Sequence, residues 1–249
     1  MENIISVKDM TFEYVSIDSK FRAIDNLNLE VKQGEFVAII GHNGSGKSTL
    51  SKNLNAILVP TEGDIYIDGM NTKDEAKLWD IRQTAGMVFQ NPDNQIVATI
   101  VEEDVAFGPE NLGIEPKVIR QRVEESLKSV GIYELKDRQP HLLSGGQKQR
   151  GASARALITN PRIIFADEPT GALDSKSSKD LLISLKKANE SGNATILMVT
   201  HDAYSASYAK QVYMLSDGAI KCRLNHSGER QKFYDEILSL LASMGSEQE

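Results

Sequence analysis

Residues 41–48, read Gly-His-Asn-Gly-Ser-Gly-Lys-Ser, constrain the fold of this chain more than any other segment. They follow the continuously apolar run 36–40, and a helical pattern begins at Lys47 and continues to about Ile57. A glycine-rich loop between a buried strand and a helix points backbone N–H groups at an anion, and the helix N-terminus adds its positive dipole end. The segment therefore predicts a phosphate-binding loop.

Two side chains of this loop carry the chemistry that a nucleoside triphosphate requires. Lys47 supplies a point charge for the β- and γ-phosphates, and the Ser48 hydroxyl is a ligand for Mg²⁺. ATP and Mg²⁺ are therefore the predicted ligands. The candidate cradle consists of Gly41, His42, Asn43, Gly44, Ser45, Gly46, Lys47, Ser48 and Thr49.

Two acidic residues follow a second apolar run, 163–166. Asp167 ends that run, and at the tip of a strand beside the phosphate loop it is expected to hold Mg²⁺. Glu168 comes next, points differently, and is expected to orient or deprotonate an attacking water. An Asp-Glu pair after a strand is more often an ordinary turn. The phosphate loop upstream favours the catalytic interpretation.

Short apolar runs and helical patterns alternate along the chain. The first third is rich in strand patterns, 97–132 is helical with a break near Gly108 and Pro109, and 144–159 is a further helix. Two buried runs, 163–166 and 195–199, flank the helical run 177–190, and the tail 230–244 has apolar residues spaced for one helix face. This alternation predicts an α/β fold with a parallel sheet.

Composition narrows the class of protein. The net charge of −7 argues against nonspecific binding to nucleic acid or to an anionic membrane surface. The single cysteine, Cys222, excludes an internal disulfide and fits a reducing compartment. The first residues lack the pattern of a signal peptide, and no run approaches the roughly 20 apolar residues that cross a bilayer. We expect a cytoplasmic chain.

Residues 143–147, Leu-Ser-Gly-Gly-Gln, precede Lys-Gln-Arg and the strand that ends in Asp167. With these motifs in this order the sequence resembles the ATP-binding subunits of ABC transporters over nearly its whole length. The resemblance implies that ATP is held between two subunits and that the γ-phosphate of the opposite subunit's ATP is bound by Ser144, Gly145, Gly146 and Gln147. The alternative for this segment is an ordinary helix cap, because serine is a good N-cap residue.

The resemblance assigns four further positions. It implies that Tyr14 stacks on adenine, that Gln90 reaches Mg²⁺ and the attacking water, that Asp174 belongs to a loop communicating between the two sites, and that His201 contacts the γ-phosphate. The alternatives are an edge-strand residue for Tyr14, a loop amide for Gln90 and a histidine without a special role for His201.

The resemblance also implies the architecture. We expect one ATPase domain over 1–249, with a RecA-like P-loop core, an antiparallel β subdomain near the N-terminus, a helical ABC-specific subdomain at about 91–155 and a C-terminal helix at about 230–244.

The two halves of the chain resemble different subfamilies. Residues 89–95 and 101–112 are similar to ATPases of energy-coupling-factor importers, which take up vitamins, cobalt or nickel. Residues 154–161, 166–176 and 198–202 look like ATPases of the macrolide-export and bacitracin-resistance type. A natural recombinant, an engineered chimera or an assembly artefact would each produce a junction near 147–150. Because the family receives its membrane partner on the region 90–130, which is importer-like here, we favour the importer over a peptide-antibiotic or macrolide exporter.

The resemblance implies two partners, a second ABC ATPase subunit, identical or different, and a transmembrane coupling protein. It predicts no nucleic-acid partner and contact with the inner face of the cell membrane only through partner subunits. Two interpretations outside transport remain, a soluble ABC ATPase of DNA repair or translation and a module that senses nucleotide without turnover. The single compact cassette argues against the first, and Glu168 with His201 argues against the second.

Overall fold

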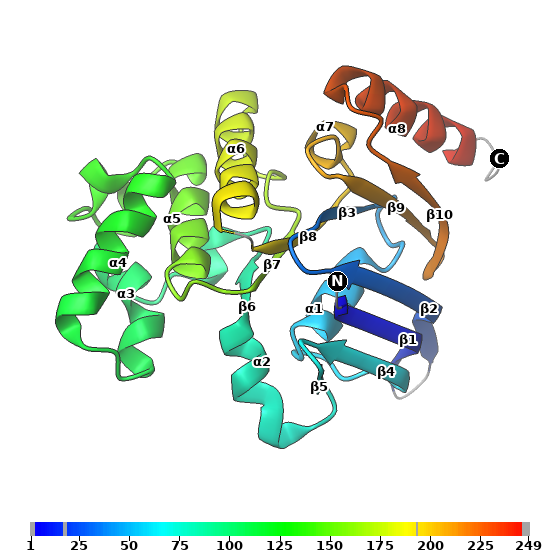
Figure 1. The fold of residues 1–249 in the computed structure, drawn as a ribbon, viewed down its shortest axis with the longest axis horizontal. Helices are drawn as coiled ribbons and strands as arrows, with labels where there is room; N and C mark the ends of the chain where they lie inside the picture. Colours follow the sequence, from blue (N-terminus) through cyan, green and yellow to red (C-terminus); the bar gives the residue numbers. More distant parts are fainter. Residues whose placement is uncertain (1–2, 17–18, 193, 246–249) are drawn as a thin grey trace.

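The computed structural model describes residues 3–16, 19–192 and 194–245, without the side chains of 94, 191, 192, 244 and 245, and its described part contains two sheets (Figure 1). The larger sheet has six strands in the order β10-β9-β3-β8-β7-β6. All neighbours in it are parallel except β10, which runs antiparallel to β9. Its strands are β3 (Phe36–Ile40), β6 (Ala85–Val88), β7 (Ile163–Asp167), β8 (Thr195–Thr200), β9 (Gln211–Ser216) and β10 (Ala219–Asn225).

The central strands β3, β7 and β8 are buried at every residue. Alternate residues of β3 belong to different cores, because successive side chains of a strand point to opposite faces. Val37 and Ile39 pack in one cluster with Leu50 of α1 (Lys47–Leu54), whereas Phe36 and Ala38 pack in another with leucines of α6 (Ser175–Gly192). Helices on both faces explain the continuously apolar strand sequences.

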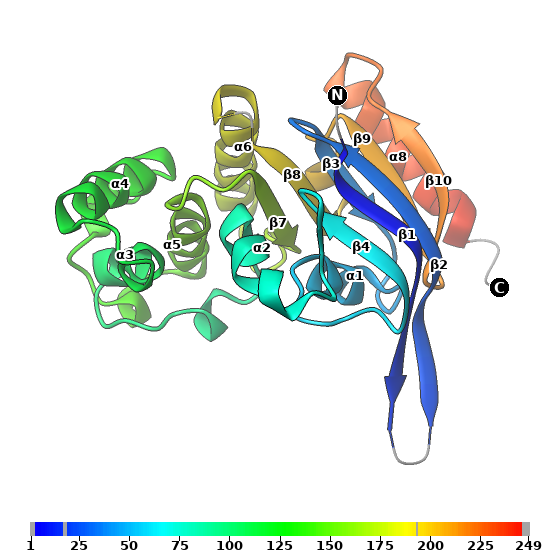
Figure 2. The ribbon, with the colours of Figure 1, turned by 60° about the horizontal axis from the view of Figure 1, so that its bottom comes forward.

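The smaller sheet is antiparallel and has the order β2-β1-β4-β5. Its strands are β1 (Asn3–Val15), β2 (Lys20–Lys32), β4 (Glu62–Ile67) and β5 (Met70–Asn71). Strands β1 and β2 continue together beyond β4 as a long two-stranded arm (Figure 2). The predicted α/β class with a P-loop core and an N-terminal antiparallel sheet is confirmed.

Helices α3 (Val101–Asn111), α4 (Pro116–Ser129) and α5 (Gly145–Leu157) share a separate apolar cluster and lie to one side of the sheets (Figure 1). The break predicted near Gly108 and Pro109 is present but lies a few residues later, because both residues are still inside α3. A proline so near the end of a helix removes only one backbone hydrogen bond. The chain leaves the helix at 112–115, where Gly113 has a φ of 66° that favours glycine at a helix end.

The C-terminal helix α8 (Arg230–Gly245) packs Phe233 and Ile237 against the sheet, in one cluster with Val212 and Met214 of β9. No helix among the described residues is long and apolar enough to cross a membrane. The remaining elements are the helices α2 (Leu78–Thr84) and α7 (Ala203–Ala206) and the 3-10 turns η1 (Glu75–Lys77), η2 (Pro92–Asn94), η3 (Tyr133–Leu135) and η4 (Pro140–Leu142).

Candidate functional site

The predicted phosphate loop lies between β3 and α1, at the carboxyl end of the parallel strands. Its last glycine, Gly46, has a φ of 103°, and a Cβ atom there would lie 2.5 Å from Ala23 O. Only glycine allows the loop to approach β2 this closely before α1 begins. The close packing of the loop against β2 therefore requires glycine at position 46.

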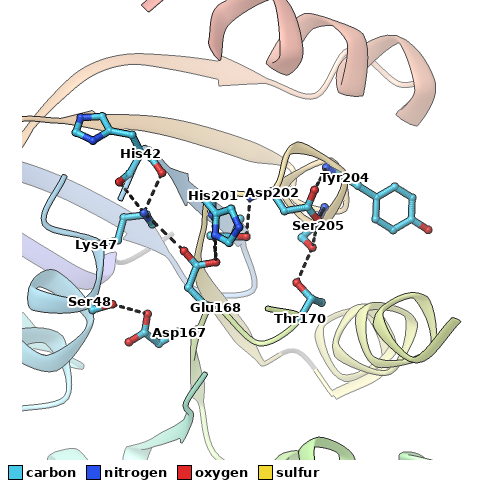
Figure 3. A network of polar contacts seen from close by, with 12 residues as sticks. His42, Lys47, Ser48, Asp167, Glu168, Thr170, His201, Asp202, Tyr204 and Ser205 are labelled. Carbon is cyan, nitrogen blue, oxygen red and sulfur yellow. Dashed lines mark hydrogen bonds and ion pairs between the residues drawn. The ribbon is translucent and has the colours of Figure 1, made fainter. Parts of the chain in front are cut away.

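Lys47 is buried within the loop and points back across it (Figure 3). Its Nζ donates to Gly41 O at 2.8 Å and to His42 O at 2.9 Å, and lies 3.6 Å from Glu168 Oε1. The backbone carbonyls and the carboxylate together compensate the desolvated charge. This geometry fixes one positive charge at the loop.

Ser48 and Asp167 meet at the other side of the loop (Figure 3). Ser48 Oγ donates to Asp167 Oδ1 at 3.1 Å. Burial raises the pKa of the Asp167 carboxyl, and the hydrogen bond from Ser48 opposes that rise. The buried Ser45 Oγ has no hydrogen-bond partner among the described residues. A hydroxyl beside a carboxylate is a donor set that suits a hard cation such as Mg²⁺.

Glu168 and His201 form the third part of the site. Glu168 is buried and has a φ of 47°, a left-handed conformation that is uncommon outside glycine. Its Oε2 accepts the backbone N–H of His201 at 3.2 Å and lies 2.8 Å from the imidazole Nδ1. The carboxylate is thus held between Lys47 and His201, the arrangement expected of an oriented acid–base group.

One cavity of about 330 Å³ brings together nine of the predicted residues. It is lined by residues of the loop, by the end of β7 and by segments that follow β6 and β8. The lining residues are Phe21, Ala23, Asn43, Gly44, Gly46, Lys47, Ser48, Thr49, Gln90, Glu168 and His201. Four predicted segments distant in sequence therefore line one cavity, together with Phe21 and Ala23 of β2.

Phe21 and Ala23 were missed by the sequence analysis. Phe21 is 60% exposed and lies opposite Tyr14 in the β1–β2 register. The Tyr14 hydroxyl lies 3.2 Å from Thr49 Oγ1, and its ring packs edge-on against Phe12. An exposed phenylalanine opposite Tyr14 could have indicated a second aromatic residue at the site. Recognising it required the register of the β1–β2 hairpin.

Ser144, Gly145, Gly146, Gln147 and Asp174 do not line that cavity. Ser144 caps α5, with its Oγ accepting from Gln147 N at 3.3 Å and Gln147 Oε1 accepting from Ser144 N at 2.9 Å. In the single chain Ser144 therefore acts as the N-cap of α5, which was the alternative interpretation of this segment. The first turn of α5 is therefore separate from the cavity that contains Lys47 and Glu168.

Asp174 performs a similar role at α6. Its Oδ1 accepts hydrogen bonds from the backbone N–H groups of Lys176 and Ser177 at 3.0 Å. The hydrogen bonds from Ser177 hold the pKa of Asp174 below its usual value. A Cβ at Gly146 would lie 2.6 Å from Ser177 Oγ, so the starts of α5 and α6 pack closely. These five residues therefore belong to two adjoining helix starts. The other predicted residues that do not line the cavity belong to the phosphate loop or contact its residues Ser48 and Thr49; they are Tyr14, Gly41, His42, Ser45 and Asp167.

Comparisons with known proteins agree with this geometry. A family model described as ABC transporter matches residues 24–171. The chain is 64% identical over 218 residues to the energy-coupling factor transporter ATP-binding protein EcfA1 of Clostridioides difficile, a match covering 88% of this chain and 79% of the relative. It is 42% identical over 242 residues to EcfA of Pediococcus pentosaceus, covering 96% of this chain and 84% of that relative.

Two solved structures are also similar. The dimeric ATP-binding cassette MJ0796, in a post-hydrolysis state bound to ADP and Pi, has a TM-score of 0.83 and 37% identity, covering 90% of this chain and 100% of that one. CbiO1 of Clostridium perfringens, part of the transporter complex cbiONQ, has a TM-score of 0.83 and 34% identity, covering 95% of this chain and 92% of that one.

The expected junction near 147–150 receives no support from these comparisons. The match to the Pediococcus relative covers 96% of the chain, so it continues through this region. The segments that look export-like lie around Asp167 and His201. Two of them, 166–176 and 198–202, contain the candidate residues Asp167, Glu168 and His201, which the resemblance assigns to ABC ATPases in general, so these two do not separate one subfamily from another.

Proposed function

The chain belongs to the ABC transporter family, among the ATP-binding subunits of energy-coupling factor transporters, and we propose that it powers an importer of vitamins or metal ions. It binds and hydrolyses ATP. The observation that carries the proposal is the cavity in which Lys47, Ser48, Gln90, Glu168 and His201 converge. Its helix N-terminus, ammonium and carboxylates are the groups that phosphoryl transfer to water requires.

In the proposed mechanism the loop N–H groups and Lys47 bind the β- and γ-phosphates of ATP. Glu168 Oε1 accepts a proton from the attacking water, while His201 holds Oε2 and so fixes the carboxylate. Ser48, Gln90 and Asp167 would hold Mg²⁺, which, when bound, neutralises charge on the phosphates. Tyr14, next to the cavity through Thr49, would stack on adenine. The products are ADP and phosphate.

The residues at the starts of α5 and α6 complete a site on another subunit. The backbone N–H groups in the first turn of α5 have no hydrogen-bond acceptor in a preceding turn of the helix. They are therefore suited to bind a phosphate. We assign Ser144, Gly145, Gly146 and Gln147 to the ATP held by a second ATPase subunit, identical or different, with Asp174 on the adjoining loop. The similar structure of MJ0796 is dimeric, which supports this assignment.

The membrane partner is assigned to the region 90–130. Gln90 lies at the nucleotide cavity, and a second cavity of about 350 Å³ follows it, lined by Asp93, Ile96, Ala98, Thr99, Gln139, Pro140 and His141. Val97 and Leu142 are exposed at 58% and 63%. Apolar residues beside a hollow suit a protein partner. We propose that a transmembrane coupling protein docks here, and that the chain reaches the inner face of the cell membrane only through it.

The helices that carry this region act, in our proposal, as one subdomain of about 91–155, because α3, α4 and α5 share their own apolar cluster. The route from Gln90 toward the partner runs through Asp93 and Gln95. The side chain of Asn94, which belongs to the same segment, lies outside the described residues. Different contacts in the two nucleotide states are what coupling through this segment requires.

Phosphate release by the purified chain with Mg-ATP tests the activity, and pull-down of purified membrane partners tests the transporter type. We expect the chain to bind the coupling protein of a vitamin or metal-ion importer and not a bacitracin-type permease. Replacing residues 90–130 with those of an export-type ATPase, while Gln90, Gln95 and Asp104 are kept, should reverse this preference and leave basal hydrolysis largely intact. Binding of the unaltered chain to the export permease alone would favour a peptide-antibiotic or macrolide exporter instead.

A further inference from the structure

Side chains of α5 hold the loop 89–98, which we call the Gln90 loop, at several points. The fully buried Gln149 donates from Nε2 to Phe89 O at 2.8 Å, one residue before Gln90. Lys148 Nζ lies 2.7 Å from Asp93 Oδ1 in the same loop. The loop that lines the nucleotide cavity is thus attached directly to the helix that follows the 143–147 segment.

Arg155, near the end of α5, makes the most extensive of these attachments. Its Nη2 donates to Gln95 Oε1 at 2.9 Å, and its Nη1 donates to Gln95 O and lies 3.5 Å from Asp104 Oδ2. The buried Asp104, on α3, accepts the backbone N–H groups of Val97 and Ala98 on its other oxygen at 2.7 and 3.3 Å. The guanidinium and the carboxylate together hold three residues of the loop, Gln95, Val97 and Ala98.

The contacts of Arg155 oppose separation of the Gln90 loop from α5. A planar guanidinium that donates to a carbonyl, an amide oxygen and a carboxylate has few alternative arrangements in a poorly hydrated site. Breaking one buried contact leaves a charge or a polar atom without a partner, which is costly. The Gln90 loop and α5 therefore move together, so that a displacement of one is passed to the other.

We propose that Arg155 is a positioning residue that couples the two ATP sites of the dimer. Gln90 belongs to the site of its own chain, whereas Ser144 and the two glycines after it begin α5 and serve the ATP of the partner. Through Arg155, engagement of Gln90 with one ATP sets the position of Ser144 against the other. This inference rests on the proposed function, in particular on ATP shared between two subunits.

The chain offers a matched control on the same helix. Arg150 Nη2 lies 3.1 Å from Asp180 Oδ2 of α6, and the side chains of Arg150 and Arg155 are both 19% exposed. Asp180→Asn therefore removes an ion pair that anchors α5 without touching the Gln90 loop. A general loosening of α5 would affect both variants, and loss of coupling would affect only Arg155→Met.

The experiment measures phosphate release and ATP binding by the full-length chain. We expect Arg155→Met to lower the maximal rate about tenfold or more, because small misplacements of catalytic groups are costly. Its Kd for ATP at concentrations where the chain is monomeric should stay within about twofold of the wild type, because no cradle contact is lost. The dependence of rate on ATP concentration should lose any sigmoidal character, and Asp180→Asn should match the wild type.

A double-mutant cycle identifies the contact itself. Gln95→Met should lower the rate as Arg155→Met does, and the double variant should be no slower than the slower single variant. If Arg155→Met does not fold, Arg155→Lys, which retains a charge and a single donor, should fold and give an intermediate rate.

Three outcomes would overturn the proposal. These are an unchanged maximal rate in Arg155→Met, an equal loss of rate in Asp180→Asn, and additive effects in the cycle. Failure of the proposed function is distinguishable from these, because the wild-type chain would then release no phosphate.

Discussion

The Glu168 carboxylate is bound twice by His201, through the backbone N–H at 3.2 Å and the imidazole Nδ1 at 2.8 Å, both to Oε2. The other oxygen, Oε1, faces Lys47 at 3.6 Å. One oxygen of this buried carboxylate is fixed by His201, and the other lies beside the Lys47 ammonium. The carboxylate is therefore oriented and still has an oxygen that can accept a proton. This relationship supports the proposed roles of Glu168 as the catalytic base and of His201 as the residue that orients it.

Glu168→Gln should retain ATP binding and lower the rate of hydrolysis at least a hundredfold, since a positioned general base contributes about 10² to 10⁴. The variant should also remain longer in the ATP-bound dimer, because the bound ATP is not consumed. Single-turnover phosphate release and size-exclusion chromatography with ATP measure both effects. Glu190→Gln, on the exposed end of α6, is the control, and near-normal turnover in Glu168→Gln would place the base elsewhere.

Lys47→Ala should weaken ATP binding by about 2 kcal/mol, or roughly thirtyfold in Kd, because a charged hydrogen-bond donor facing the phosphates is lost. Titration calorimetry with the isolated chain measures this change. Lys187→Ala removes an exposed lysine away from the cavity and should bind ATP as the wild type does. Equal affinities of the two variants would refute the assigned cradle.

Gly146→Ala and Gly145→Ala should differ in stability. A Cβ at Gly146 would lie 2.6 Å from Ser177 Oγ and 2.9 Å from Ser177 Cβ, whereas at Gly145 the nearest atom, Ala172 O, is 3.6 Å away. Overpacking should therefore lower the free energy of unfolding of Gly146→Ala by about 1–3 kcal/mol. Gly145→Ala should unfold within about 0.5 kcal/mol of the wild type. Urea denaturation of both variants decides this, and equal stabilities would show that α5 and α6 do not pack as described.

Asp174→Ala should lower the melting temperature at pH 7 and have less effect in acid. The hydrogen bonds from Ser177 lower the pKa of Asp174 in the folded chain. A lowered carboxyl pKa contributes stability above the pKa of the unfolded chain, and this contribution disappears as the pH falls through the folded pKa. The difference in melting temperature between the variant and the wild type should therefore shrink as the pH is lowered below about 4. A difference that is constant from pH 7 to pH 3 would rule out the charged cap.

The phosphate loop, the buried strands and the acidic pair could be predicted from the sequence because each is local. Strand 36–40, loop 41–48 and the pair at Asp167 and Glu168 depend on neighbours along the chain, and they converge because parallel strands end at one edge of the sheet. The position of Phe21 could not be predicted, since it depends on the register of β1 against β2.

Contacts between segments that are distant in the sequence could not be predicted either. Arg155 is separated from Gln95 by 60 residues, and a charged residue in a helix pattern usually indicates a solvated face. The break predicted near Pro109 lies a few residues later, because the end of a helix depends on the residues beyond it as well as on proline. The importer was favoured and is confirmed, whereas the export-like motifs after residue 150 wrongly suggested a second subfamily because the catalytic segments are shared.

In the proposed dimer each ATP is held by Lys47 of one subunit and by the start of α5 of the other. Gly145→Asp is suited to test this sharing, because the site has room for a side chain and an acid is tolerated at a helix N-terminus, yet its charge would repel a phosphate. Lys47→Ala and Gly145→Asp should each be inactive alone. Mixed dimers of the two carry one composite site with both native residues.

The decisive measurement is therefore phosphate release by mixtures of the two full-length variants, under conditions in which the wild-type chain alone hydrolyses ATP. We expect that mixing the two inactive variants restores activity, with a maximum near equal proportions. If no mixture is active although both variants are folded and form mixed dimers, ATP is not shared between the subunits, and the assignment of Ser144, Gly145 and Gly146 to the partner's site is wrong.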